Sequence, residues 1–204
     1  MNEADPKAVV RDGYNAISYD YREDDADEGG YAPWIAELRH RLPDGGSVLD
    51  LGCGCGVPVS RSLSEAGYAV TGVDFSEVQI ERARELVPRG TFLVGDITQA
   101  SFPERSFDAA ACLFALIHVP LEEQRALLAR IADWLRPGGV LLITTGSKAW
   151  TGTDANWHGA KMWWSHADAD TYREWLKQAG LRIDSEDFFP EGTGGHAVFW
   201  AVRP

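Results

Sequence analysis

Hydrophobic and polar positions alternate along this chain in blocks that predict strands and helices in turn. Apolar-rich runs of about four to eight residues, such as 47–51 and 140–145, are typical of buried strands. Between them lie longer segments in which apolar side chains recur every three or four positions, as in 121–136, a period typical of helices with one buried face. Alternation of the two kinds of segment predicts a doubly wound α/β fold.

The predicted elements cover most of the chain. Helices at 6–22 and 31–42, separated by a charged, flexible linker, precede the first strand. Residues 146–167 are rich in Gly and Trp without a clear period, so we predict a loop there. The predicted strands are 47–51, 68–73, 91–94, 107–113, 140–145, 181–189 and 197–202, and the later helices are 58–66, 77–87, 121–136 and 168–179.

Composition and charge narrow the classes of substrate and partner that this chain can have. A length of 204 residues with 45% hydrophobic content fits one folded domain over 1–204. The net charge of −12 argues against a nucleic-acid backbone as partner, because such binding relies on Lys and Arg. We therefore expect a small-molecule substrate, with no nucleic acid partner.

No targeting or membrane signal is visible. The chain has no run of about 18 apolar residues that would span a membrane, and its first 30 residues lack the basic start and apolar core of a secretory signal. Its three cysteines form no disulfide framework, and the Cys53–Cys55 spacing lacks the second ligand pair of a zinc site. We expect a cytoplasmic protein with no metal and no membrane partner.

Residues 48–56, Val-Leu-Asp-Leu-Gly-Cys-Gly-Cys-Gly, join a buried strand to a turn with glycine at every second position. Glycine occurs where the backbone takes positive φ or approaches a ligand too closely for a Cβ atom. The helix that follows points its free N–H groups at whatever the loop holds, so the pattern predicts a nucleotide-type ligand. The dinucleotide motif would need glycine at position 57, which is Val57, and this argues against a nicotinamide cofactor.

The spacing from Asp50 through Gly52 and Gly54 to Gly56 resembles the first motif of the class I S-adenosylmethionine-dependent methyltransferases. Further segments that resemble later motifs of this superfamily follow in order across 48–145. The resemblance implies a Rossmann-like, seven-stranded sheet of order 3-2-1-4-5-7-6 with strand 7 antiparallel, a single methyltransferase domain and S-adenosylmethionine as cofactor.

The resemblance also implies roles at the cofactor. Asp74 would accept hydrogen bonds from the ribose hydroxyls and Asp96 one from the adenine amino group, while Phe75 and Ile97 would flank the adenine. The alternatives are a solvated Asp74 before a helix and a turn aspartate at 96 that binds its own backbone. The other residues expected at the cofactor are Asp50, Gly52, Cys53, Gly54 and Gly56 of the loop, and Phe114 beyond the fourth strand.

Residues 13–21 resemble the helix that lies over the cofactor in small-molecule methyltransferases, so residues 1–42 are expected to form a helical cover. Tyr14 and Tyr19 match two recurring tyrosines whose hydroxyls reach the methionine part of the cofactor or the active site. An amphipathic helix whose tyrosines pack against the sheet edge is the alternative.

Residues 157–166 resemble the substrate loop of bacterial methyltransferases. Met162, Trp163, Trp164 and His196 are expected to contact a flat aromatic acceptor, although a Trp-rich stretch also fits a small core beneath a loop.

Two histidines are candidate bases, because imidazole titrates near neutral pH. His118 is the first polar side chain beyond the apolar stretch after the fourth strand, and His166 ends the substrate loop. A His118 that only hydrogen-bonds to the backbone stays open as an alternative.

The resemblance implies methyl transfer, and the aromatic loop and acidic charge favour O or N of a small, aromatic molecule as the acceptor, of the kind found in bacterial secondary metabolism. A C-methyltransferase and a non-methylating relative that binds the cofactor, such as a cyclase or binding module, are the rival interpretations. A nicotinamide oxidoreductase fits the glycine spacing least.

Overall fold

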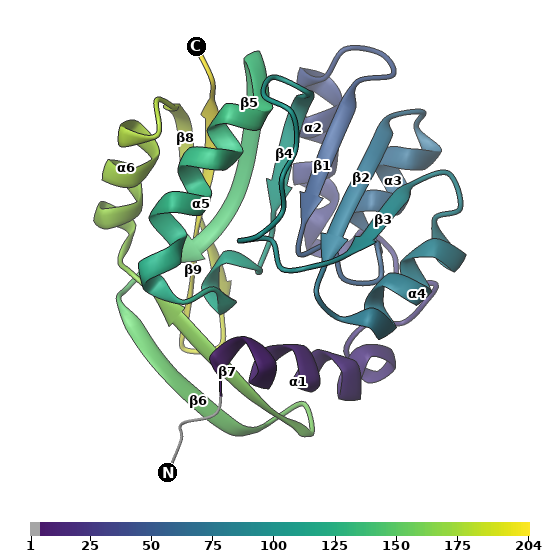
Figure 1. Ribbon diagram of the computed structural model, residues 1–204, viewed down its shortest axis with the longest axis vertical. Coiled ribbons are helices and arrows are strands. Elements are labelled where there is room, and N and C mark those ends of the chain that lie inside the picture. The colour runs from purple at the N-terminus through teal and green to yellow at the C-terminus, as the bar shows by residue number, and fades with distance from the viewer. Residues whose placement is uncertain (1–4) are drawn as a thin grey trace.

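A seven-stranded sheet organises residues 5–204, which are the residues that the computed structural model describes (Figure 1). The first four residues of the predicted cover over 1–42 lie outside this range. The strands run in the order β3-β2-β1-β4-β5-β9-β8. Their bounds are β1 (Ser47–Leu51), β2 (Ala69–Asp74), β3 (Thr91–Val94), β4 (Phe107–Cys112), β5 (Leu135–Gly146), β8 (Arg182–Glu191) and β9 (Gly194–Val202).

The sheet has the topology that the sequence motifs implied. The first five strands pair in parallel, while β9 is antiparallel to both of its neighbours, β5 and β8. Counted among themselves, the seven strands follow the predicted order 3-2-1-4-5-7-6. The labels differ only because a separate two-stranded sheet, β6-β7, intervenes in the chain.

Helices cover both faces of the sheet because the central strands are apolar on both sides. In β5, Leu141 and Ile143 face the core beneath α5 (Leu121–Trp134) and α6 (Ala169–Gln178). Alternate residues Val140 and Leu142 face the core beneath α2 (Ala32–Arg41) and α3 (Val59–Glu65). A smaller cluster joins α4 (Glu77–Leu86) to Phe92 of β3.

The predicted loop over 146–167 is wrong, since most of it is a hairpin of β6 (Trp150–Trp157) and β7 (Ala160–His166). Its two-residue turn is His158–Gly159, with φ of 49° and 97°. Two successive positive φ angles are typical of the tight turns that join hairpin strands. The sequence signal for this hairpin was the His158–Gly159 pair with aromatic residues on both sides of it. Elsewhere β5 begins at Leu135 and β9 at Gly194, earlier than predicted.

The linker between the first two helices is anchored, in contrast to the flexible linker predicted. The buried guanidinium of Arg82 donates to Asp24 Oδ1 at 3.1 Å and to the carbonyl of Arg22 at 2.6 Å. Arg61 donates to the carbonyl of Asp24 at 2.8 Å, and a 3₁₀ turn, η1 (Gly29–Tyr31), follows. The linker is therefore bound to the body of the protein through its backbone carbonyls and the Asp24 carboxylate.

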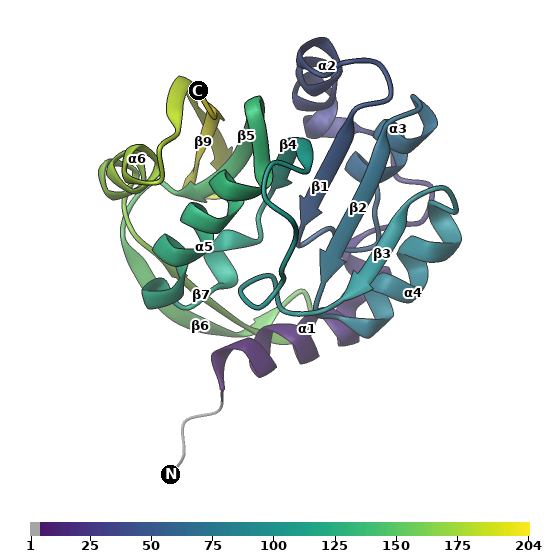
Figure 2. The same cartoon turned by 45° about the horizontal axis from the view of Figure 1, so that its top comes forward.

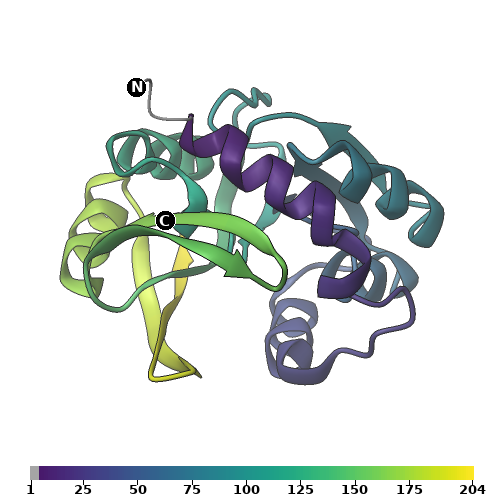
Figure 3. The ribbon, with the colours of Figure 1, turned by 90° about the horizontal axis from the view of Figure 1, so that it is seen from below.

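Helix α1 (Pro6–Tyr21) and the β6-β7 hairpin lie side by side across the carboxyl ends of the parallel strands (Figure 3). They touch at Gly13, where a Cβ atom would lie 2.8 Å from the carbonyl oxygen of Lys161 and 2.9 Å from Cε of Met162. Met162 is fully buried in a cluster with Val10 and Ile17 of α1. Its predicted contact with substrate is therefore corrected to a packing role.

Among residues 5–204, no helix has both the length and the apolar character needed to cross a bilayer.

One buried amide ties α5 to the loop before it and to the hairpin. Gln124 Nε2 lies 2.7–3.1 Å from the carbonyl oxygens of Leu116, Val119 and Ser165, which share its two N–H groups, and its Oε1 accepts from the Tyr172 hydroxyl at 2.6 Å.

We expect Gln124→Leu to lower the free energy of unfolding by about 3 kcal/mol, because it leaves several buried polar groups without partners. The matched change Gln178→Leu, at an exposed position of α6, should cost less than about 0.5 kcal/mol. Urea denaturation of both variants measures the difference, and equal effects would contradict the structural role of Gln124.

Candidate functional site

A cavity with about 710 Å³ of empty space, the open space at its mouth included, lies between the carboxyl ends of the parallel strands and α1. Figure 2 shows β1 and β2 directed toward α1 from above. Open α/β sheets bind ligands at this edge, where the strand order reverses. The lining residues are Lys7, Val10, Tyr14, Tyr21, Tyr31, Gly52, Gly54, Asp74, Phe75, Gln79, Gly95, Asp96, Ile97, Leu113, Phe114, Ala115, His118 and Val119.

The glycine loop after β1 leaves space for a ligand. Gly52 has φ of 71°, and a Cβ atom there would clash with Ala115. Gly54 has φ of 53°, yet a Cβ atom there would meet nothing closer than Gln79 at 4.0 Å. Gly95, after β3, has no protein atom within 4 Å of such a position. Gly54 and Gly95 thus face the cavity, and side chains there would fill ligand space.

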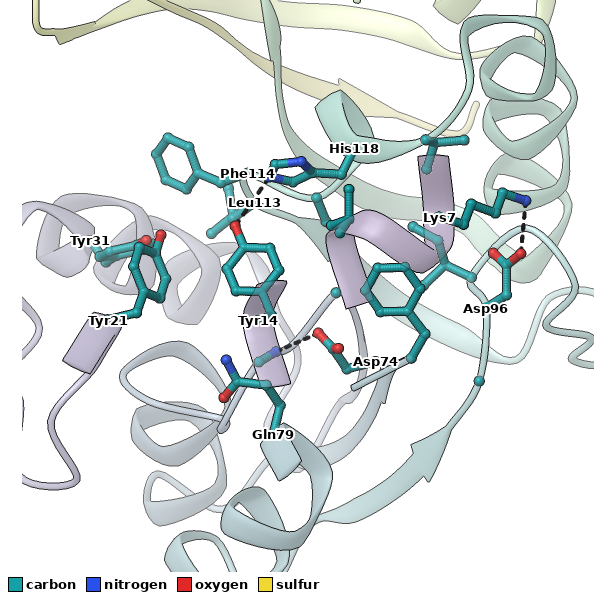
Figure 4. A pocket seen from close by; sticks show the side chains of 18 residues that line it. Lys7, Tyr14, Tyr21, Tyr31, Asp74, Gln79, Asp96, Leu113, Phe114 and His118 are labelled. Atoms are coloured by element: carbon teal, nitrogen blue, oxygen red, sulfur yellow. Dashed lines mark hydrogen bonds and ion pairs between the residues drawn. The ribbon is translucent and has the colours of Figure 1, made fainter. Parts of the chain in front are cut away.

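Asp74 ends β2 with its carboxylate held at the cavity wall (Figure 4). The Gly54 N–H donates to Oδ2 at 3.0 Å and the Ser76 N–H donates to Oδ1 at 2.9 Å. Burial raises the pKa of Asp74 to about 6, although these backbone hydrogen bonds oppose the rise. The carboxylate still has lone pairs for a ligand, because two oxygens offer about four acceptor sites.

Asp96, after β3, holds α1 to the rim of the cavity. Lys7 Nζ donates to Asp96 Oδ2 at 2.8 Å and to Glu123 Oε2 at 2.6 Å, and the Thr98 N–H donates to Asp96 Oδ1 at 2.8 Å. Burial favours a higher pKa for Asp96, but the hydrogen bonds from Lys7 and Thr98 outweigh it and lower the pKa. Lys7 was not predicted, since only the tertiary fold brings it to Asp96.

His118 lies in η2 (Leu116–His118), where α1 and β7 both reach it. The Tyr14 hydroxyl is 3.1 Å from Nε2, and Nδ1 is 2.7 Å from the carbonyl oxygen of Trp163. A carbonyl oxygen only accepts, so Nδ1 carries the proton and Nε2 accepts from Tyr14. Burial lowers the pKa of His118 to about 4. These contacts favour a role in holding α1 and β7 together over the predicted role as base.

Tyr21 occupies the place that was expected for Tyr19. Tyr19 is 64% exposed, and its ring lies 4.2 Å from the guanidinium carbon of Arg82, outside the cavity. Tyr14 and Tyr21 are seven residues apart, so the helical period places them on one face, whereas Tyr19 points away. Burial raises the pKa of Tyr14 and of Tyr21. The expectation for Tyr19 is thus corrected.

Three predicted loop residues support the site without lining the cavity. Asp50 is buried and accepts from Ser60 Oγ at 2.6 Å, and burial raises its pKa to about 6. Cys53 packs with the cluster beneath β3, and a Cβ atom on Gly56 would lie 3.1 Å from a methyl of Val87.

A second hollow, which we call the trough, lies between the β6-β7 hairpin and the turn that joins β8 to β9. It adjoins the first cavity at two aromatic contacts. The Phe114 ring is 5.2 Å from that of His196, and the His118 ring is 5.6 Å from that of Trp164. The trough is lined by Ser147, Lys148, Ala149, Trp150, Thr153, Asp154, Ala155, Trp164, His166, Glu191, Thr193, Gly194, Gly195 and His196.

All but one of the remaining predicted residues line one of the two hollows, and the exception is Trp163. Phe75, Ile97 and Phe114 line the cavity, as expected. Trp164 and His196 line the trough together with His166, while Trp163 contributes its carbonyl to His118. Within residues 5–204, no group of three or more His, Cys, Asp or Glu side chains is placed to hold a metal ion.

Residues 48–139 match the family of methyltransferase domains. The chain is similar to a sterol 24-C-methyltransferase of Gibberella zeae, with 36% identity over 125 residues, or 57% of this chain and 31% of that protein. It is also similar to an O-methyltransferase of Pyrenophora dematioidea, with 32% identity over 155 residues, or 71% of this chain and 57% of that protein. The chain thus spans less than two thirds of the length of these relatives.

Among solved structures, the chain is similar to magnesium protoporphyrin IX methyltransferase of Synechocystis PCC 6803 with bound S-adenosylmethionine. The TM-score is 0.74 with 25% identity, and the match covers 100% of both chains.

The low pKa of His118 leads to a prediction about stability. The ordinary pKa of histidine is about 6.5. Between about pH 6.5 and 4, His118 is therefore protonated in the unfolded chain and neutral in the folded chain. The stability of the natural chain relative to His118→Gln should therefore fall by up to about 3 kcal/mol as the pH is lowered through this window. Denaturation curves of both proteins between pH 7 and 4 measure this, and a constant difference would contradict the buried, neutral imidazole.

Proposed function

Because this chain belongs to the class I S-adenosylmethionine-dependent methyltransferases, we propose that it transfers a methyl group to O or N of a small aromatic molecule. The observation that carries the proposal is the pairing of two adjoining hollows. One has carboxylates placed for a nucleoside, and the other has aromatic walls and imidazoles.

The cavity residues fit the cofactor. Asp74 has free acceptor capacity for two ribose hydroxyls, and Asp96 lies beside the apolar side chain of Ile97 at a place suited to adenine. Gly52 and Gly54 bring the backbone close to the ligand, and Gly95 leaves open space beside Asp96.

The cofactor supplies a methyl group on a sulfonium that is already a good leaving group. What the protein adds is alignment and the exclusion of water. Helix α1 covers the cavity, and the hydrogen bonds of Tyr14 and Lys7 hold it there. The contact between Phe114 and His196 marks the boundary at which an acceptor in the trough would approach the cofactor cavity.

An aromatic acceptor is supported by the rings of Trp150 and Trp164 in the trough, whose centroids are 5.9 Å apart. An O or N acceptor is supported by the imidazoles of His166 and His196, because a base is needed only where the attacking atom carries a proton at neutral pH.

A C-methyltransferase is the second candidate, and the similarity to the sterol 24-C-methyltransferase favours it. A non-methylating relative that binds the cofactor would keep the cavity and lack transfer to any acceptor. A place in secondary metabolism and a cytoplasmic location stay predictions.

Calorimetric titration tests the cofactor. We expect S-adenosylmethionine and S-adenosylhomocysteine to bind with micromolar dissociation constants and NADH not to bind. Asp74→Ala should weaken both by roughly 10- to 100-fold, because charged hydrogen bonds contribute about 1.5–3 kcal/mol each. Asp44→Ala, at an exposed turn, is the matched control and should bind as the natural chain does. If the natural chain binds neither sulfur compound, the proposal fails.

The raised pKa of Asp74 predicts a pH dependence of cofactor binding. The ionised carboxylate is the stronger acceptor for two hydroxyls, and burial places its pKa at about 6. Affinity for S-adenosylhomocysteine should therefore fall below pH 6, by up to about tenfold per pH unit. In Asp74→Asn this dependence should be largely lost, while any contribution from the buried Asp50 is common to both proteins. Parallel pH profiles for the two proteins would exclude Asp74 as the cause.

A further inference from the structure

Two histidines that line the trough each have an imidazole nitrogen that is buried without a hydrogen-bond partner. These nitrogens are Nδ1 of His166 and Nδ1 of His196, and no other side-chain nitrogen or oxygen in residues 5–204 shares this state. His196 is 9% exposed. Because an unpaired buried polar atom is costly, Nδ1 of His196 points to a ligand whose polar group would pair with it, whereas Nδ1 of His166 packs against Gly146.

Gly146 brings the two rings to the same end of β5. It pairs with His196 across β5 and β9, and a Cβ atom on Gly146 would overlap the His166 ring. Any larger residue at 146 would displace His166, which comes from the other hairpin. The glycine thus gathers side chains from β7 and β9 at the inner end of the trough.

Glu191 determines which nitrogen of the His196 ring carries the hydrogen. The His196 Nε2 lies 2.7 Å from Oε2 of Glu191, and a carboxylate only accepts, so Nε2 carries the proton. The lone pair of neutral His196 is therefore on Nδ1, the atom without a partner. A carboxylate bonded to one imidazole nitrogen orients the ring and stabilises the positive charge that forms when the other nitrogen takes up a proton.

The surroundings of His196 suit a planar ligand at the boundary of the cofactor cavity. Its ring stands edge-on to Phe114 at 5.2 Å, with an interplanar angle of 89°. Trp150 is 49% exposed and lies beside both Trp164 and His166, with ring centroids 5.9 and 6.1 Å away. Exposed aromatic faces of this kind bind flat rings by stacking.

We propose that His196 is the proton acceptor of the acceptor site, that Glu191 is its positioning residue, and that the acceptor is a planar aromatic molecule with a phenol-type hydroxyl. The proposal rests on the proposed function. In the proton transfer, the O–H bond of the acceptor breaks, its electron pair stays on oxygen, and a new N–H bond forms at Nδ1 of His196. The products are a phenolate, which is a stronger nucleophile than the phenol, and an imidazolium paired with Glu191.

His118 is not the proton acceptor in this arrangement, because its Nε2 already accepts from Tyr14 and its Nδ1 donates to Trp163. The other titratable and charged groups that face His196 are His166 from β7 and His118 from η2, with Lys148 and Asp154 lining the trough from the β5-β6 side.

The test uses the full chain with 4-nitrophenol and 4-nitro-1-naphthol, whose ionised forms have their own visible absorption band. Binding is followed by quenching of tryptophan fluorescence, and ionisation by the phenolate band, without cofactor. We expect binding to lower the apparent pKa of the bound probe by about one unit or more, because the imidazolium favours the phenolate.

Variants separate the roles of the residues. In His196→Gln the probe should still quench fluorescence but lose the pKa shift. Glu191→Gln should lose most of the shift, and Glu191→Asp should restore part of it, which a merely structural role would not produce. His40→Gln, exposed on α2, is the control and should behave as the natural chain does. Trp150→Ala should weaken probe binding several-fold.

Three results would overturn the proposal. They are a full pKa shift in His196→Gln, no probe binding by the natural chain, and probe binding unaffected by Trp150→Ala. Titration of S-adenosylhomocysteine in parallel keeps the two proposals distinguishable. If the natural chain fails to bind it, the proposed function fails, whereas the ionisation of the probe still tests His196. We expect His196→Gln to bind S-adenosylhomocysteine within about twofold of the natural chain, since the change leaves the cavity carboxylates intact.

Discussion

The contact between α1 and β7 is the constraint on which the rest of the site depends. The absence of a side chain at Gly13 lets the helix lie against the backbone of Lys161, and Met162 fills the space between them. At this distance the Tyr14 hydroxyl reaches His118, which in turn holds the carbonyl of Trp163. One line of hydrogen bonds thus connects the helix over the cofactor cavity with the hairpin that forms a wall of the trough. If only one of these elements moved, a buried donor or acceptor would lose its partner, at a cost of its full desolvation free energy. We therefore expect α1 and the hairpin to move together.

The cover that α1 forms over the strand ends also determines the pKa values of the carboxylates at the cavity. Covering the strand ends removes water from Asp50 and Asp74, and burial raises the pKa of each to about 6. Asp96 differs because it stays near the rim, where Lys7 donates to it and its pKa is lowered. The cavity therefore has two kinds of carboxylate. The deep one, Asp74, accepts two backbone N–H groups and keeps acceptor capacity for a ligand hydroxyl, whereas the one at the rim is already paired with the helix that covers the cavity.

Much of this was predictable from local pattern, and the failures have identifiable causes. The order of the strands and the cavity positions of Gly52, Asp74 and Asp96 follow from motif spacing, because each residue sits at the end of a strand whose direction the fold class determines. Tyr19 was misplaced because a motif match was preferred to the helical period, which selects Tyr21. The hairpin over 150–166 was missed because tryptophan and glycine give no clean alternation. Lys7 and Glu191 carry no local signal, since only tertiary contacts give them partners.

The family match covers strands beside the cavity but none of the residues that line the trough. The family match ends at residue 139, whereas every residue of the trough lies at 147 or beyond. Gly146, at the end of β5, therefore lies between the residues that line the cavity and those that line the trough, where we propose that the acceptor binds. Similarity to relatives that methylate carbon or oxygen thus says little about the acceptor atom here, because the two hairpins proposed to bind the acceptor lie beyond the family match. The chemistry of the trough is the better guide, and an imidazole whose proton position is fixed by a carboxylate favours an acceptor that must lose a proton.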